Sequence, residues 1–77
     1  MSFTIHWDPA ALFVFYRLRV AAATAVDRAI LRWAQTGEGD LEWVAPYHRL
    51  RAGRYEVALS INRVRRTVDV IRIYGAR

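Results

Sequence analysis

The chain has 77 residues, enough for a single domain over 1–77, and its 55% apolar and 13% aromatic content excludes a disordered chain. It contains no cysteine, which excludes a disulfide framework and a thiolate metal site and is compatible with the cytoplasm. Residues 1–48 contain four arginines and five acidic residues, whereas residues 49–77 contain eight arginines and two acidic residues. Such clustering is typical of a surface that binds phosphate, although an acidic protein would fit it equally well.

The first predicted elements are a strand and the beginning of a helix. Residues 2–7 alternate between apolar and polar side chains, which is the pattern of a half-buried strand. Asp8 suits the N-cap of a helix, and Pro9 suits its first position, where the missing N–H costs nothing. No glycine or proline follows until after Gln35, and Thr36-Gly37 then supplies a stop signal.

This helical segment is expected to form two helices. A single helix over all of it would be too long for so small a domain, so we expect a break near residues 17–20 and two antiparallel helices. One face of the second helix is apolar and is expected to pack on the core. It carries Ala22, Val26, Ala29, Ile30 and Trp33.

The first helix is apolar nearly all round. Such a helix is either buried on two sides or partly covered by another chain. Its large side chains are the predicted partner-binding residues, namely Leu12, Phe13, Phe15 and Tyr16. The apolar run is too short to span a bilayer, ends at Arg17 and follows no basic segment. We therefore expect neither a signal peptide nor a membrane anchor.

The second half of the sequence indicates a small sheet. Residues 36–46 contain several turn-forming residues and are expected to be a connector. Ala52-Gly53 suits a tight link and residues 62–66 a hairpin loop. The predicted strands are Tyr47–Arg51, Arg54–Ile61 and Thr67–Tyr74. The predicted fold is therefore α+β, with one strand, two antiparallel helices and then a three-stranded antiparallel meander.

One face of this predicted sheet gathers arginine and tyrosine side chains, with His48 nearby. The set is Tyr47, Arg49, Arg51, Arg54, Arg72, Tyr74 and Arg77. Cleavage of RNA at a 2′-hydroxyl needs groups that deprotonate the hydroxyl, stabilise charge on the phosphorane and protonate the leaving oxygen. Arginine suits the second role through bidentate contacts to phosphate, and tyrosine can stack on a base or donate a proton. The same side chains would also serve as ordinary surface residues of a small sheet.

Metal and cofactor chemistry is not indicated. His6 and His48 are the only histidines, and neither belongs to a cluster with the spacing of metal ligands. The sequence has no glycine-rich phosphate loop and no motif of an activated nucleophile. We therefore expect no metal site and no cofactor.

Three segments carry a resemblance to a known family. They are FTIHWDPAAL at the start, AILRWAQTGEGDL at the exit of the second helix and HRLRAGRYEVALSINRVRRTVDVIRI across the sheet. These segments resemble the RelE/ParE superfamily, the toxins of bacterial type II toxin–antitoxin systems. The resemblance covers nearly all of the chain and has the element order expected of the family.

The resemblance implies a fold like that of the microbial RNases and a toxin that is neutralised by a cognate antitoxin. The target would be mRNA in the ribosomal A site, as in the RelE branch, or DNA gyrase, as in the ParE branch. A third interpretation is a basic module without toxicity that only binds an antitoxin-like partner. Each of these implies a cytoplasmic protein.

The resemblance also concerns individual residues. Arg49 and Arg51 match the basic positions that flank the leucine of the second strand in the RelE branch. Where the family has an arginine directly after a tyrosine, this chain has Glu56, so the implied catalytic set is incomplete. Two alternatives therefore stay open: the chain cleaves RNA, or it binds RNA without cleaving it. The candidate catalytic residues are Arg49, Arg51, Arg72, Tyr74 and Arg77, and the candidate RNA-binding residues are Tyr47, His48 and Arg54.

Overall fold

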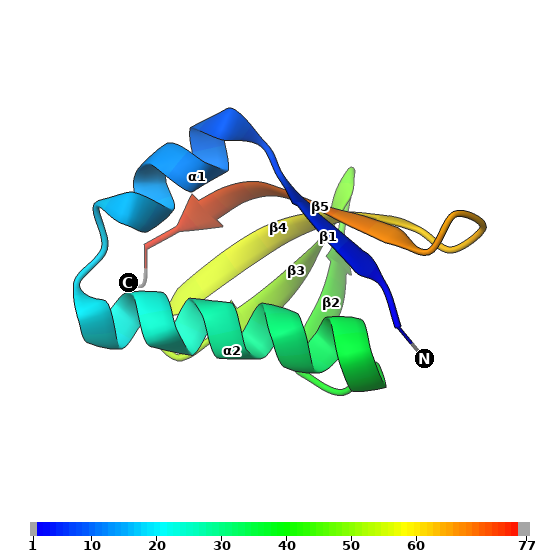
Figure 1. The fold of residues 1–77 in the computed structure, drawn as a ribbon, viewed down its shortest axis with the longest axis horizontal. Helices are drawn as coiled ribbons and strands as arrows, with labels where there is room; N and C mark the ends of the chain where they lie inside the picture. The colour runs from blue at the N-terminus through cyan, green and yellow to red at the C-terminus, as the bar shows by residue number, and fades with distance from the viewer. Residues whose placement is uncertain (1, 76–77) are drawn as a thin grey trace.

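The computed structural model describes residues 2–75, which form a five-stranded sheet and two helices (Figure 1). The elements are β1 (Thr4–Trp7), α1 (Pro9–Tyr16), α2 (Val20–Thr36), β2 (Leu41–Val44), β3 (Tyr47–Ala52), β4 (Tyr55–Asn62) and β5 (Thr67–Tyr74). The strands lie in the order β1-β5-β4-β3-β2, and β1 runs parallel to β5 while the other neighbours are antiparallel. The α+β class and the β3–β4–β5 meander are thus confirmed.

The start of α1 and the end of α2 follow the capping signals of the sequence. The Asp8 side chain accepts a hydrogen bond from the backbone N–H of Ala10 (2.9 Å), with proline at the first helical position. α1 ends at Tyr16 and α2 begins at Val20, which confirms the predicted break. α2 ends before Gly37, whose φ of 78° is a conformation that glycine adopts without strain. Neither helix in residues 2–75 is long and apolar enough to cross a membrane.

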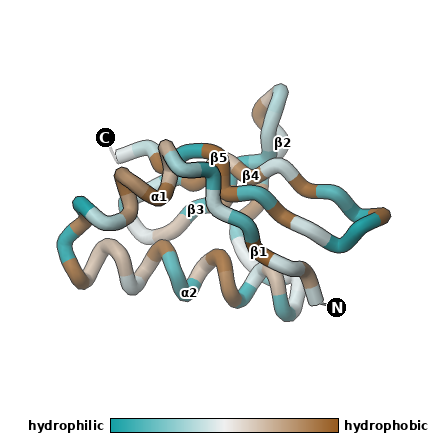
Figure 2. The backbone as a smooth tube through the Cα atoms, turned by 45° about the horizontal axis from the view of Figure 1, so that its top comes forward, coloured by the Kyte–Doolittle hydropathy of each residue, from teal (hydrophilic) through white to brown (hydrophobic). Residues whose placement is uncertain are grey.

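The chain reverses direction between α1 and α2, and the two helices pack on different strands. α1 contacts β5, whereas α2 contacts β3 and β4 (Figure 1). Figure 2 shows α1 apolar along most of its length and α2 alternating between apolar and polar residues. The buried core combines the apolar stripe of α2 with one face of the sheet, and its members are Phe3, Ala11, Val26, Ile30, Trp33, Ala34, Leu50, Ala52, Val57, Leu59, Val68, Val70 and Ile73.

The predicted sheet was wrong in its number of strands. The segment 36–46, expected to be a connector, contains β2, which pairs with β3 at the edge of the sheet. Three of its four side chains (Glu42, Trp43 and Val44) are exposed, so burial imposes no clear alternation on the sequence. The segment is a strand because it pairs with β3, although its own residue pattern does not indicate one. The parallel pairing of β1 with β5 was not predicted either, because the residue pattern of one segment does not indicate which distant segment it will pair with.

A β-bulge in β5 explains why its sequence is apolar on both faces. Ala58 pairs with Arg72 and Leu59 pairs with Val70, so Ile71 is an extra residue between the two pairs. Val70 and Ile73 are three positions apart and would lie on opposite faces of a regular strand, but the bulge lets both face the core. It also leaves Arg72 and Tyr74 on the same face, as the sequence predicts.

Candidate nucleic-acid interface

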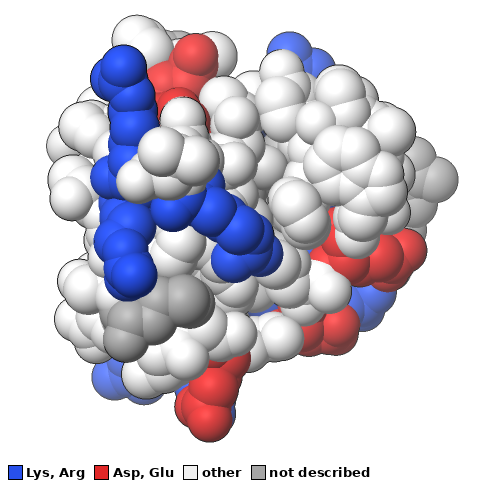
Figure 3. Space-filling model, turned by 90° about the vertical axis from the view of Figure 1, so that its right-hand side faces the viewer, with Lys and Arg blue, Asp and Glu red and all other residues white. Residues whose placement is uncertain are grey.

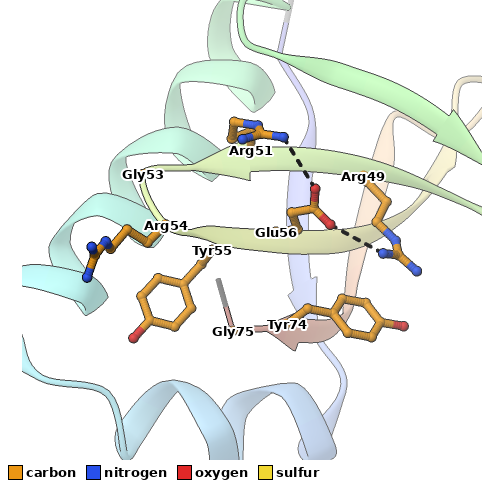
Figure 4. A pocket seen from close by; sticks show the side chains of 8 residues that line it. All are labelled: Arg49, Arg51, Gly53, Arg54, Tyr55, Glu56, Tyr74 and Gly75. Atoms are coloured by element: carbon orange, nitrogen blue, oxygen red, sulfur yellow. Dashed lines mark hydrogen bonds and ion pairs between the residues drawn. The ribbon is translucent and has the colours of Figure 1, made fainter. Parts of the chain in front are cut away.

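A hollow of about 680 Å³ lies at the end of the sheet where β3 turns into β4 and β5 ends (Figure 4). The tight turn Gly53-Arg54 brings the strand ends together, and Gly53 has a φ of 61°, which suits glycine. The residues that line the hollow are Arg49, Arg51, Gly53, Arg54, Tyr55, Glu56, Tyr74 and Gly75. Three arginines and one carboxylate therefore face a space large enough for a nucleotide.

The position of these side chains follows from strand register. Leu50 pairs with Val57, and both are fully buried under α2. Because successive side chains of a strand alternate between faces, the neighbours Arg49, Arg51 and Glu56 lie on the face turned away from α2. Burial of an apolar pair thus fixes the orientation of the charged ones.

Glu56 bridges the two arginines of β3. Its Oε1 accepts a hydrogen bond from Arg49 Nη1 (3.3 Å), and its Oε2 lies 3.6 Å from Arg51 Nη2 (Figure 4). Arg51 is also tied to Asp40, through an ion pair of 3.6 Å and through its backbone N–H, which donates to the Asp40 carbonyl (2.9 Å). The arginines are therefore held in place before any ligand arrives.

Arg49 has a second contact, with the aromatic ring of Tyr74. Its guanidinium carbon lies 4.2 Å from the ring centroid, which is a cation–π contact between β3 and β5. Tyr74 is also the register partner of Glu56. The carboxylate, the guanidinium and the ring therefore form one group of three side chains from three adjacent strands.

The structure brings together only part of the predicted site. Arg49, Arg51 and Tyr74 meet in the hollow, and Arg54 lines it but points away from them (Figure 4). Arg72 is exposed on the same face of the sheet, outside the lining of the hollow. Arg77 lies outside the described residues.

The remaining two candidates lie farther along β3. His48 pairs with Leu59 on the core face, where its ring lies 4.9 Å from that of Trp43, so it is on the opposite face from Arg49. Tyr47 is half-buried at the start of β3 and does not line the hollow.

Two residues that hold the arginines of the site in place were not among the predicted site residues. From sequence, Glu56 is only the replacement of an arginine, whereas in the structure it is the residue that connects Arg49 to Arg51. The signal for it is the two-residue turn, since a turn at Gly53-Arg54 forces Arg51 and Glu56 to pair. Asp40 was missed because the connector before β3 was not recognised as leading into a strand.

A second hollow, of about 270 Å³, lies between the two helices. Its lining is Phe15, Tyr16, Leu18, Val20, Ala23, Thr24 and Asp27. Tyr16 and Val20 are three-quarters or more exposed, and Phe13 of α1 is also largely exposed. Of the predicted partner-binding residues, Phe13 and Tyr16 are therefore on the surface. Leu12 and Phe15 are half-buried, with the Phe15 ring packed 4.8 Å from that of Trp7.

A second charged region is the loop between β4 and β5. Arg63, Arg65 and Arg66 are all exposed, and among residues 2–75 no carboxylate lies within 4.0 Å of them. The Asn62 side chain accepts a hydrogen bond from the backbone N–H of Arg65 (2.9 Å) and so shapes the loop. Figure 3 shows positive charge gathered on the side of the molecule from which this hairpin projects.

Comparison with solved structures identifies the fold. No protein-family model matches the chain, and no curated protein matches it. The toxin–antitoxin complex RelBE2 from Mycobacterium tuberculosis contains a similar chain, with a TM-score of 0.79, 18% identity and coverage of 97% of this chain and 99% of that one. The archaeal RelE–RelB complex from Pyrococcus horikoshii gives a TM-score of 0.74 at 19% identity, with 97% and 96% coverage.

The isolated Escherichia coli RelE toxin is also similar, with a TM-score of 0.77, 15% identity and coverage of 99% of this chain and 86% of that one. These similarities extend over nearly the whole of the described chain, including both helices and the sheet. They confirm the fold that the resemblance in sequence implies. This chain has the fold of the RelE toxins.

Proposed function

We propose that this chain is the toxin of a toxin–antitoxin pair and that it acts in the cytoplasm by binding mRNA at the ribosome. The observation that carries the proposal is the hollow on the sheet, where Glu56 bridges Arg49 and Arg51 and the Arg49 guanidinium lies over the ring of Tyr74. Two guanidinium groups suit the oxygens of a phosphate, and an adjacent ring suits a stacked base. The RelE fold supports the same interpretation.

The proposed partner is an antitoxin that covers the apolar surface of the helices. Tyr16 and Val20 rim an apolar hollow, and apolar side chains this exposed are expected to be covered by another chain. Two of the similar chains described above come from complexes of RelE with RelB, which agrees with a partner of this kind. Such a partner would also stabilise a domain this small by mass action.

A ribosome assay tests the target. Purified chain is added to ribosomes programmed with a defined mRNA, and both bound protein and mRNA ends are measured. We expect the protein to bind the programmed ribosomes and new mRNA ends to form at the codon in the A site. Binding without new ends would leave an RNA-binding toxin that does not cleave. No binding, together with inhibition of DNA gyrase supercoiling in a parallel assay, would replace this proposal with a gyrase inhibitor.

A growth assay tests toxicity. Expression of the chain alone should slow the growth of a bacterial host, and co-expression of its antitoxin should restore growth. Normal growth with abundant folded protein would contradict a toxin and favour a module that only binds a partner.

A further inference from the structure

The described lining of the hollow offers a carboxylate that can act as a base. The three arginines of this lining are hydrogen-bond donors without an acceptor, and its two tyrosines offer hydroxyl groups. Glu56 is the only carboxylate of this lining. Its side chain is 40% exposed, so a substrate can reach it, and strand pairing at Arg51 holds its backbone in place.

The carboxylate lies where a base for RNA cleavage is needed. Each of its oxygens faces a different arginine, Arg49 at 3.3 Å and Arg51 at 3.6 Å. In RNA, the 2′-hydroxyl is attached to the carbon next to the one that bears the 3′-phosphate. A phosphate held by these two arginines would therefore present its neighbouring 2′-hydroxyl close to the carboxylate. The arginines would offset the repulsion between the carboxylate and the phosphate.

We infer that Glu56 is the general base of the RNA cleavage that the proposed function allows, and the inference rests on that function. Its carboxylate takes the proton of the 2′-hydroxyl, and the 2′-oxygen forms a bond to the adjacent phosphorus. The bond from phosphorus to the 5′-oxygen breaks, and that oxygen takes a proton from water. Glu56 then returns its proton to the solvent, so the products are a 2′,3′-cyclic phosphate and a 5′-hydroxyl with no net change in protons.

In this arrangement Arg49 and Arg51 stabilise the charge on the phosphorane. This chain lacks the arginine that the RelE-like pattern has at this position, and Glu56 in its place would supply a different catalytic function. A purely structural role is the competing explanation, in which Glu56 only holds the two arginines in position through its ion pairs. The two explanations differ in what happens when the carboxylate is replaced by an amide of the same size.

The test compares the full chain with its Glu56→Gln variant on ribosomes programmed with mRNA, measuring binding and cleavage separately. Gln keeps an oxygen that can accept a hydrogen bond from Arg49 but cannot take up a proton. We expect the cleavage rate to fall by roughly 10²- to 10⁴-fold, the usual contribution of a general base. RNA binding should stay equal or become tighter, because a negative charge has been removed from the hollow.

Two further variants complete the test. Glu42→Gln makes the same change at an exposed residue of β2 that pairs with Arg49, and it should cleave like the unmodified chain. Glu56→Asp keeps a carboxylate and should retain more cleavage than Glu56→Gln, which guards against a variant that fails to fold.

The outcomes separate the inference from the function on which it rests. Cleavage by Glu56→Gln at the unmodified rate, or binding of RNA by the unmodified chain without any cleavage, overturns the role of Glu56 and leaves RNA binding intact. Failure of the unmodified chain to bind programmed ribosomes at all refutes the proposed function, and the inference with it.

Discussion

Arg49 is the residue at which the interactions of the hollow meet. Its guanidinium donates to Glu56 and lies over the ring of Tyr74, and its side chain is only 31% exposed. Arg51 is twice as exposed and is held by two carboxylates, Glu56 and Asp40. The two arginines therefore differ in how firmly they are fixed, although they are only two positions apart on one strand.

The first prediction concerns these two side chains. Arg49→Ala and Arg51→Ala should each weaken RNA binding and reduce the slope of log affinity against log salt by about one for each phosphate that is no longer neutralised. Stability should change by no more than about 1 kcal/mol, because partly exposed ion pairs and cation–π contacts contribute little. A salt titration of binding measures both quantities, and urea unfolding checks the fold.

The control for this prediction is Arg28→Ala, which removes one arginine from an exposed position of α2. It lowers the net charge by the same amount without touching the hollow. An equal loss of affinity in Arg28→Ala would mean that the arginines act only through the total charge of the molecule.

Among the elements, the helices were the easiest to predict from sequence and the sheet the hardest. Asp8, Pro9 and Gly37 are local signals that act on their own neighbours, so the helix boundaries could be derived from them. β2 lies at an edge with little burial, and β1 finds its place only beside a strand from the other end of the chain. Neither feature leaves a clear pattern in the sequence.

The same distinction holds for the site. Arg49, Arg51 and Tyr74 could be assigned to one face from alternation within β3 and from the residues near the end of β5. The role of Glu56 depends on the register between β3 and β4, and that of Asp40 on a strand that was not expected. The face on which a side chain lies could therefore be predicted from the alternation within one strand. The ion pairs between side chains of different segments could not.

At the level of the helices and strands, a second prediction concerns the surface formed by α1 and the start of α2. Tyr16→Asp should weaken antitoxin binding at least roughly tenfold, because it places a charge in an apolar interface from which binding excludes water. The fold should be retained, since Tyr16 is 75% exposed. Isothermal titration with the product of the neighbouring reading frame measures the affinity.

Val64→Asp is the matched control, because Val64 is 95% exposed in the loop between β4 and β5, and this loop projects away from both helices (Figure 1). If it weakens binding as much as Tyr16→Asp, the antitoxin does not recognise the helix surface specifically.

For the molecule as a whole, the placement of charge is more informative than the total of +5. Arginines lie at both ends of β4, in the hollow at one end and in the loop of Arg63, Arg65 and Arg66 at the other. Eight residues of strand separate the two groups by roughly 25 Å. At physiological salt, exposed charges interact over only about 8–10 Å, which is less than this separation. The two groups would therefore contact different parts of an RNA.

The prediction that follows is a dependence on RNA length. Replacing Arg63, Arg65 and Arg66 together by Gln should weaken binding to ribosomes and lower the salt slope by up to about three. Binding of an oligonucleotide that fills only the hollow should be unchanged. A variant with Arg17, Arg19 and Arg28 replaced by Gln carries the same change of charge on the helix side, and an identical effect of both variants would contradict a specific role for the loop.

The pairing of β1 with β5 has a consequence for the way the chain folds. Thr4 lies beside Thr67, so a strand near the start of the chain gains its partner only when a strand near the end is available. Closing so long a loop costs conformational entropy before the contacts between the two strands form and offset that cost. This fold is therefore expected to form slowly for its size. Until then β1 has unpaired edges that can associate with other chains. Loss of β5 would therefore leave β1 without any partner strand and β4 unpaired on one side, and it would remove Tyr74 from the hollow at the same time.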